Sequence, residues 1–178
     1  MHPLEKFEYC PKCGSHHFVA NGATSKKCEN CGFEYFMNPS ASNVAIIKNA
    51  KGEILVERRK QEPAKGTLDL PGGFTQIGET SEEGLAREVM EETGLKVTDA
   101  RYLFSLPNIY RYSGIDIHTL DMFYLCEVED DSVVIPMTFT PNSSVCVQYV
   151  GDSSSFLSVR TDLRRLKRRR LKECNIIM

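Results

Sequence analysis

The chain has 178 residues, of which 41% are hydrophobic and 26% charged, and this composition is typical of one soluble globular domain with a small appendage. No apolar run approaches the roughly 20 residues that span a membrane, and the first residues lack a signal peptide's apolar core, so we expect a cytoplasmic protein. The formal net charge is −2, yet residues 160–178 hold eight basic side chains against two acidic ones. A dedicated nucleic-acid-binding protein is basic over a whole face, so we do not expect nucleic acid as the partner.

Two C-x-x-C pairs open the chain, Cys10 with Cys13 and Cys28 with Cys31, and 14 residues separate them. Each pair forms a tight turn, followed by a glycine, that directs two thiolates at one centre. Four thiolates suit tetrahedral Zn²⁺, so the spacing predicts a structural zinc ribbon. The alternative is a pair of local disulfides, which a cytoplasmic setting disfavours.

Strand patterns dominate the middle of the chain. Runs at 43–49 and 53–59 are joined by a hairpin turn at Lys51-Gly52, and longer runs follow at 96–110 and 115–129. A loop with a short extended segment occupies 62–74, and one further strand is expected around 145–150. The repeated leucines of 162–173 predict a basic surface helix.

The stretch 73–95, "GFTQIGETSEEGLAREVMEETGL", predicts a loop followed by a helix over about 81–93. Thr80 or Ser81 can cap this helix, and Glu83 stands at the capping-box distance from Thr80. Glu82 and Glu83 then lie in the first turn, where the helix dipole favours acidic side chains. At about 100° per residue, an apolar face that packs on a sheet is formed by Leu85, Ala86, Val89 and Met90.

Three carboxylates share the opposite face of this helix. Glu88, Glu91 and Glu92 are spaced i, i+3 and i+4, and only Arg87 is close enough to offset their repulsion. A divalent cation reverses such repulsion, and carboxylate oxygens are the ligands that Mg²⁺ or Mn²⁺ prefers. Glu79, at the end of the preceding loop, can reach the same cluster.

The same stretch resembles the signature of the Nudix hydrolases, G-x5-E-x7-R-E-U-x-E-E-x-G-U, where U is a bulky apolar residue. All nine fixed positions are matched over 23 residues, by Gly73, Glu79, Arg87, Glu88, Val89, Glu91, Glu92, Gly94 and Leu95. The resemblance implies an α+β fold, the Nudix α/β/α sandwich with a mixed sheet. We therefore expect a zinc ribbon over 1–38 and a Nudix domain over 39–178.

The resemblance also implies roles for individual residues. Glu88 and Glu92 correspond to the principal Mg²⁺ or Mn²⁺ ligands, and Glu79 to an auxiliary ligand. Glu91 corresponds to a further ligand or to the base that deprotonates the attacking water. Arg87 resembles the arginine that orients a catalytic glutamate, so the expected catalytic set is Glu91, Arg87 and Glu92. Gly73 resembles the glycine whose backbone supports the metal site, next to the substrate.

A zinc ribbon before a Nudix domain is similar to the layout of the NADH pyrophosphatases, which also carry S-Q-P-W-P-F-P-x-S after the signature. The corresponding "SLPNIYRYS" (105–113) keeps only Ser105, Pro107 and Ser113. NADH or NAD, ADP-ribose and nucleotide sugars therefore all remain candidate small-molecule substrates. Tyr110 and Tyr112, which follow an expected Pro-Asn turn, are the best candidates for substrate contact. Dimers are common in the family, which makes a homodimer an expectation.

Two functions of different classes follow. The first is a metal-dependent hydrolase that cleaves a diphosphate bond in a nucleoside diphosphate linked to another group. The second is a regulatory protein that senses a nucleotide at a weak Nudix site and binds nucleic acid or a partner through its ribbon. The complete set of signature glutamates favours the hydrolase.

Overall fold

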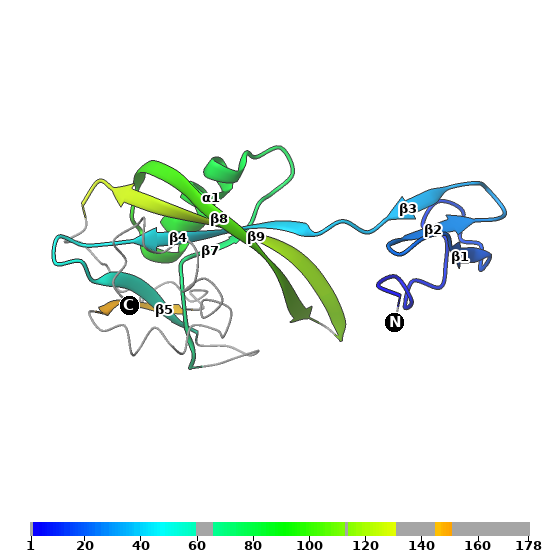
Figure 1. Cartoon of the computed structure of the whole chain (residues 1–178), viewed down its shortest axis with the longest axis horizontal. Coiled ribbons are helices and arrows are strands. Elements are labelled where there is room, and N and C mark those ends of the chain that lie inside the picture. The colour runs from blue at the N-terminus through cyan, green and yellow to red at the C-terminus, as the bar shows by residue number, and fades with distance from the viewer. Residues whose placement is uncertain (1, 60–65, 113, 131–144, 151–178) are drawn as a thin grey trace. The chain divides into compact units, whose positions relative to one another are not determined.

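The computed structural model describes residues 2–59, 66–112, 114–130 and 145–150 (Figure 1). The expected basic helix at 162–173 and Ser113 lie outside these residues. The chain forms two compact units, one of Met1–Ser40 with Pro107–Leu120 and one of Ala41–Leu106 with Asp121–Met178. The domain boundary expected at residue 38 stays a prediction. No helix among the described residues is long and apolar enough to cross a membrane.

The first unit contains a small three-stranded antiparallel sheet. Its strands are β1 (Phe18–Ala20), β2 (Ser25–Cys28) and β3 (Glu34–Phe36), in the order β1-β2-β3. Its core is very small, with Phe18 buried beside two cysteines and Phe33 packed against them. A unit of about 40 residues with so small a core usually needs a metal or disulfides to fold on its own.

The second unit is built around a sheet in the order β7-β4-β9-β8. These strands are β4 (Ser40–Ile47), β7 (Gly72–Phe74), β8 (Val97–Tyr112) and β9 (Ile115–Val128). The end of β8 and the start of β9, within Pro107–Leu120, belong to the first unit. β7 pairs antiparallel to β4, whereas the arrowheads of β4 and β9 point the same way in Figure 1, so the sheet is mixed. With the single described helix, this arrangement confirms the α+β fold class.

A second sheet has the order β10-β5-β6, with β5 (Ile54–Arg59), β6 (Leu68–Asp69) and β10 (Val145–Val150) all antiparallel. The strands expected near 43–49, 53–59 and 145–150 are therefore confirmed. β4 and β5 start as the expected hairpin, with a bridge between Lys48 and Ile54, but then enter different sheets. Both faces of β4 are covered, because Ala45 and Ile47 join one buried cluster and Ile46 joins another.

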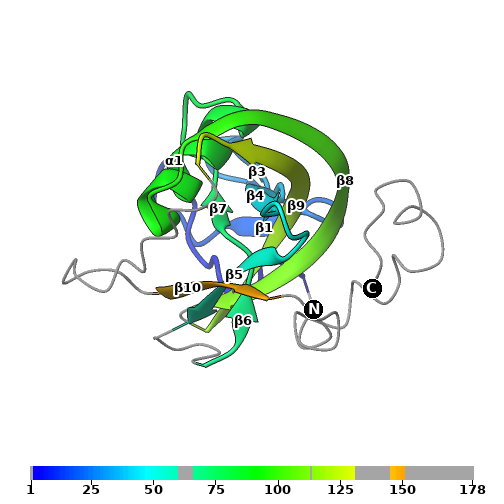
Figure 2. The same ribbon diagram turned by 90° about the vertical axis from the view of Figure 1, so that its left-hand side faces the viewer.

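The helix α1 (Ser81–Thr93) has the predicted limits and lies beside β7 (Figure 2). Leu85 and Val89 are fully buried in a cluster with residues of β4, β5 and β9. Met90 corrects the sequence prediction, because it is 41% exposed rather than packed on the sheet. The face that contacts the sheet is narrower than the apolar residues alone suggest.

β8 also corrects a prediction. The turn expected at Pro107-Asn108 does not form, because β8 runs without interruption to Tyr112 and the chain reverses at Gly114, where φ is 75°. β8 is the last strand of its sheet, and an edge strand tolerates proline because one row of its N–H groups needs no partner strand.

Candidate functional site

The loop before α1 is fastened to the helix by a capping box. Thr80 Oγ1 accepts a hydrogen bond from Glu83 N at 3.2 Å, and Glu83 Oε2 accepts one from Thr80 N at 2.7 Å. Of the two caps that the sequence allowed, the structure therefore has Thr80. The Ser81 hydroxyl instead donates to Asn43 Oδ1 at 2.6 Å and accepts from Tyr124 Oη at 2.7 Å. The start of α1 is thus fixed to β4 and β9.

Arg87 is the centre of the acidic cluster. Its guanidinium binds both oxygens of Glu79, at 2.6 and 3.0 Å, and donates to Glu88 Oε1 at 2.8 Å. It also reaches the Phe74 carbonyl oxygen at 3.1 Å and Glu91 Oε2 at 3.4 Å. A guanidinium has five N–H donors, and these five contacts use them all. The hydrogen bond from Arg87 is the main reason why the pKa of Glu79 is lowered.

Gly73 is required by the position of Glu88. A Cβ atom at Gly73 would stand 2.6 Å from Glu88 Cδ and 2.7 Å from Glu88 Oε2, closer than real Cβ contacts. The absent side chain lets the Glu88 carboxylate lie against the backbone of β7. The signature glycine therefore has a direct structural reason, namely the close approach of a strand to a helical carboxylate.

Glu92 makes none of the five contacts of Arg87; instead its Oε2 accepts a hydrogen bond from Gly72 N at 2.9 Å. Burial raises the pKa of Glu92 to about 7, and the nearby charges of Glu88 and Asp69 act in the same direction. The hydrogen bonds from Gly72 and from Glu57 act against this rise. A partly buried carboxyl group among other carboxylates favours the protonated form until a cation is near.

The structure therefore gathers the four signature glutamates into two groups. Glu79, Glu88 and Glu91 surround Arg87, while Glu92 accepts a hydrogen bond from the first residue of β7. Glu91 is the most open of them, since its side chain is 58% exposed, against 19% for Glu88. Within the described part of the chain, only the four cysteines bring three or more metal-ligating groups close together. The glutamate metal site and the catalytic roles stay predictions.

The four cysteines come from two turns with the same backbone geometry. Gly14 N donates to Cys10 O at 2.8 Å, and Gly32 N donates to Cys28 O at 2.9 Å. Gly14 and Gly32 have φ values of 72° and 73°, in the left-handed region that glycine adopts without strain. Each turn thus places both of its sulfurs on one side of the backbone.

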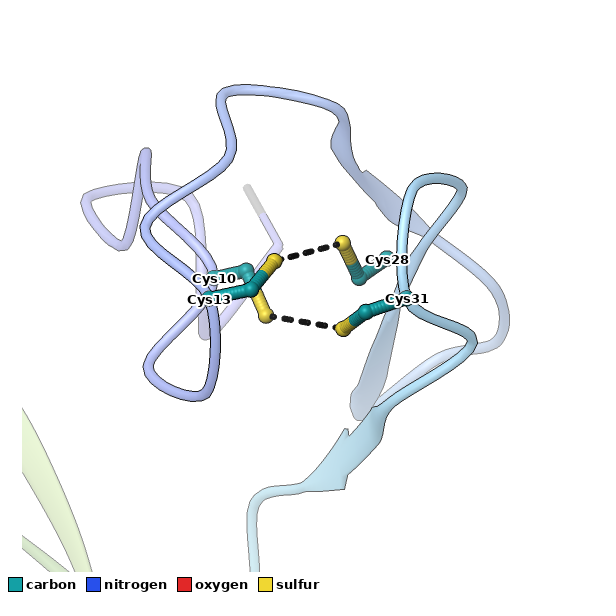
Figure 3. A group of neighbouring side chains, drawn as sticks. All are labelled: Cys10, Cys13, Cys28 and Cys31. Carbon is teal, nitrogen blue, oxygen red and sulfur yellow. Dashed lines mark hydrogen bonds between the residues drawn. The ribbon is translucent and has the colours of Figure 1, made fainter.

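The sulfurs meet in the space between these turns (Figure 3). Cys10 Sγ is 3.7 Å from Cys31 Sγ and Cys13 Sγ is 3.6 Å from Cys28 Sγ, and all four sulfurs lie within 4.8 Å of one another. Four sulfurs bound to Zn²⁺ at about 2.3 Å would lie about 3.8 Å apart, so the cluster fits a tetrahedral zinc ion. All four cysteines are free thiols, so the alternative of two disulfides is not what the structure contains.

One thiol of the cluster is especially easy to ionise. A backbone hydrogen bond from Ser15 is the largest reason why the pKa of Cys13 is lowered to about 6, with Cys31 and Asn30 adding to it. The thiolate is the form that binds metal, so this turn favours the state that a zinc site needs. Cys10 and Cys28 are buried, and buried thiolates require a cation beside them.

The expected substrate-contacting tyrosines lie near the end of β8. Tyr110 belongs to the unit that contains the cysteines, and its side chain is partly buried. Only the backbone of Tyr112 is described. The substrate roles of Tyr110, Tyr112 and Gly73 stay predictions.

Sequence reasoning missed two buried polar residues next to the cluster. Asn43 is 1% exposed, and its Nδ2 donates to Thr75 Oγ1 at 2.8 Å, which ties the signature loop to β4. Glu57 is 3% exposed on β5 and contacts Glu92. The sequence signal that could have found them is one polar side chain at the end of an apolar strand run, Asn43 in "NVAII" and Glu57 in "ILVE". A polar group that is buried in such a strand needs a specific partner.

Comparison with known proteins places the chain in a family. The family model described as NUDIX domain matches residues 37–141, more than half of the chain. The curated relatives include the NAD-capped RNA hydrolase NudC of Vibrio cholerae, 27% identical over 106 residues, which are 60% of this chain and 39% of that protein. NudC of Haemophilus influenzae is 31% identical over 108 residues, 60% of this chain and 40% of that protein. The chain matches only about two fifths of the length of these relatives.

Solved structures share the fold. A NUDIX hydrolase from Nitrosomonas europaea superposes with a TM-score of 0.64 at 24% identity, covering 90% of this chain and 89% of that one. A MutT NUDIX hydrolase from Burkholderia pseudomallei has a TM-score of 0.55 at 23% identity, covering 72% of this chain and 95% of that one. At these identities the likeness shows the fold alone.

Proposed function

The chain belongs to the NUDIX domain family, and from this premise we propose that it is a metal-dependent hydrolase of nucleoside diphosphates linked to another group. The observation that carries the proposal is the Arg87 network, which holds Glu79 and Glu88 beside β7 while Glu92 stands nearby. A structural helix face would intersperse its carboxylates with lysines. Here one guanidinium organises three of them, and Glu92 carries a raised pKa, as expected of a site prepared for cations.

The donor set fits Mg²⁺ or Mn²⁺, because every predicted ligand is a carboxylate oxygen. Glu88 and Glu92 would hold the ion, with Glu79 and Glu91 as further ligands. A bound divalent ion neutralises phosphate oxygens and lowers the pKa of its water. The cysteine cluster would hold Zn²⁺ in a purely structural role, since four thiolates leave no open position.

In the proposed reaction a water oxygen forms a bond to one phosphorus and the bond from that phosphorus to the bridging oxygen breaks. The water proton passes to a carboxylate, for which the exposed Glu91 is the candidate. Arg87 keeps Glu79 and Glu88 in place and does not itself transfer a proton. The products are two monophosphates.

The names of the relatives support a proposal for the substrate class. Several of them bear the name NAD-capped RNA hydrolase, so dinucleotides of the NAD type, free or at an RNA end, are the substrates that we propose first. ADP-ribose and nucleotide sugars share the same diphosphate and follow next.

A substrate panel tests the proposal. The full chain with Zn²⁺ would be incubated with NADH, NAD⁺, ADP-ribose, a nucleotide sugar and NAD-capped RNA in the presence of Mg²⁺ or Mn²⁺, and the monophosphate products measured. We expect turnover of one diphosphate class that requires the divalent ion. A folded protein that releases no monophosphate from any of them would contradict the proposal and favour the nucleotide-sensing alternative.

A further inference from the structure

Asn43 is a buried amide in a position that the family signature does not include. It is 1% exposed on β4, and its Oδ1 accepts a hydrogen bond from Ser81 Oγ at 2.6 Å. Its Nδ2 donates to Thr75 Oγ1 at 2.8 Å. A buried amide costs free energy unless it is hydrogen-bonded, and here both of its ends have a partner. One side chain thus joins β4 to the first residue of α1 and to the loop between β7 and α1.

The register of the sheet directs Asn43 toward the acidic cluster. Asn43 stands directly opposite Gly73 in the ladder between β4 and β7, and side chains of opposed residues lie on the same face of a sheet. A Cβ atom at Gly73 would stand 2.6 Å from Glu88 Cδ, so Asn43 lies on the face that Glu88 covers. Ala45 is two residues further along the same face and packs in the cluster that includes buried residues of α1.

The first turns of α1 have a glycine, Gly84, where the loop and β4 come closest. A Cβ atom at Gly84 would lie 3.1 Å from both Asn43 Nδ2 and Glu79 Oε2, and 3.3 Å from Thr75 Cα. The Asn43 amide, the loop backbone and the Glu79 carboxylate therefore meet at one point of the helix. Asn43 binds the loop at the place where Glu79 approaches α1.

The hydrogen bond from Asn43 to the loop is independent of the predicted metal ligands. Arg87 also contacts this loop, through the Glu79 carboxylate and the Phe74 carbonyl oxygen. Because Glu79 is a predicted ligand, a cation competes with Arg87 for its oxygens. The bond from Asn43 to Thr75 uses no predicted ligand, so it holds the loop both before and after an ion binds.

We propose that Asn43 is a positioning residue that fixes the loop between β7 and α1, and with it Glu79, in the arrangement that a divalent ion requires. The proposal rests on the proposed function only in taking Glu79 as a metal ligand. Asn43 acts through the loop and does not itself contact the ion or the substrate. Loss of a group that orients metal ligands lowers metal affinity or activity by about 10- to 100-fold.

Four variants isolate the role of this hydrogen bond. Thr75→Val removes the hydroxyl that accepts from Asn43 and keeps the shape of the side chain, whereas Thr75→Ser keeps the hydroxyl. Asn43→Leu removes both bonds of the amide at similar volume, and if it does not fold, Thr75→Val carries the test. Tyr124→Phe is the matched control, because it removes a hydroxyl that donates to Ser81 at 2.7 Å and leaves both bonds of Asn43 in place.

Manganese binding without substrate is the first readout. The full zinc-loaded chain would be titrated with Mn²⁺, with free Mn²⁺ followed by electron paramagnetic resonance, and Tm would be measured for every variant. We expect Thr75→Val and Asn43→Leu to bind Mn²⁺ about 10-fold more weakly than the unchanged protein. Thr75→Ser and Tyr124→Phe should bind it as tightly as the unchanged protein, even though Tyr124→Phe lowers Tm.

Three results of this titration would overturn the proposal. Equal Mn²⁺ affinity for Thr75→Val and the unchanged protein would show that the bond does not position a ligand. An equal loss for Thr75→Val and Tyr124→Phe would show that affinity only follows stability. An equal loss for Thr75→Val and Thr75→Ser would show that the hydroxyl is not the group that matters.

A kinetic readout on the same variants separates this proposal from the proposed function. With the best substrate of the panel, Thr75→Val should lower kcat at fixed low Mn²⁺ with KM for the nucleotide little changed, and excess Mn²⁺ should restore part of the rate. A protein that shows the Mn²⁺ pattern but hydrolyses no diphosphate would contradict the proposed function and leave Asn43 as a positioning residue. No Mn²⁺ binding by the unchanged protein would overturn both.

Discussion

The raised pKa of Glu92 makes the free energy of unfolding fall as pH rises. Most paired carboxylates have a lowered pKa and give the opposite dependence. Its pKa rises from an ordinary 4.5 to about 7, chiefly because of burial. The folded state therefore binds more protons than the unfolded state between these values, so the free energy of unfolding falls as pH rises through this window. At 1.36 kcal/mol per pKa unit the loss amounts to roughly 3 kcal/mol. Glu79, whose pKa is lowered, acts below this window, where its stabilisation is lost as pH falls.

Thermal unfolding at pH 5 and at pH 8, without added Mg²⁺ or Mn²⁺, measures this effect. We expect a lower Tm at pH 8, a smaller difference in Glu92→Gln, and recovery at pH 8 when Mn²⁺ is added. A Tm that rises from pH 5 to pH 8 and is unaffected by Glu92→Gln would show that Glu92 is not held as described.

At the scale of elements, the contact between β7 and α1 depends on the absence of a side chain at Gly73. Gly73→Ala would place a Cβ atom 2.6 Å from Glu88 Cδ, so the Glu88 carboxylate must leave its place beside Arg87. We expect diphosphate hydrolysis to fall by 10-fold or more, on the order of one misplaced metal ligand, while the protein still folds. Steady-state kinetics with circular dichroism checks both parts.

The matched control is Gln76→Ala in the same loop. Gln76 is exposed, and its contact to Glu79 Oε2 is made by the backbone N–H, which alanine keeps. The control should retain its rate. If Gly73→Ala is as active as Gln76→Ala, the close approach of Glu88 to β7 has no functional role.

Much of the helix and its site could be predicted from the sequence because the signals are local. The limits of α1 follow from a capping box and from Gly94, and the contact of Arg87 with Glu91 follows from their i, i+4 spacing. Met90 shows the limit of such reasoning, because periodicity gives a face but not the width of the surface that covers it. The turn expected at Pro107-Asn108 failed for a related reason, since an edge strand accommodates proline.

Contacts between segments that are far apart in the sequence could not be predicted from the spacing of residues. The separation of β4 and β5 into two sheets depends on which strands arrive later in the chain, namely β9 beside β4 and β6 and β10 beside β5. The approach of Glu57 to Glu92 joins residues 35 positions apart and depends on the same pairing. A charged residue in an apolar strand indicates that a partner exists, but not which one.

At the scale of the whole molecule, the two units have separate cores. The buried cluster with Cys10, Phe18 and Cys28 belongs to the first unit, and the clusters of α1 and the two larger sheets belong to the second. We therefore predict that loss of zinc, by Cys10→Ser and Cys28→Ser, unfolds residues 2–39 but leaves the second unit folded. A four-cysteine site contributes folding free energy directly, and the ribbon core is too small to replace it.

Amide hydrogen exchange resolved by peptide is the measurement, together with the zinc content of the protein. Protection should be lost in 2–39 and kept in 81–95 and 121–128. Retained protection in 2–39 without zinc would show that the cysteines are not a structural metal site.

The central claim is that the carboxylates of α1 perform metal-dependent diphosphate hydrolysis, and a pair of matched variants tests it most directly. Glu92→Gln and Glu83→Gln remove the same charge from the same helix, but Glu83 belongs to the capping box, which glutamine preserves. Initial rates of Mn²⁺-dependent hydrolysis would be measured for both variants and for the unchanged protein on the best substrate of the panel. The account predicts a loss of 100-fold or more for Glu92→Gln, on the order of a lost catalytic group, and a rate near the unchanged one for Glu83→Gln. Equal rates for the two variants would contradict it.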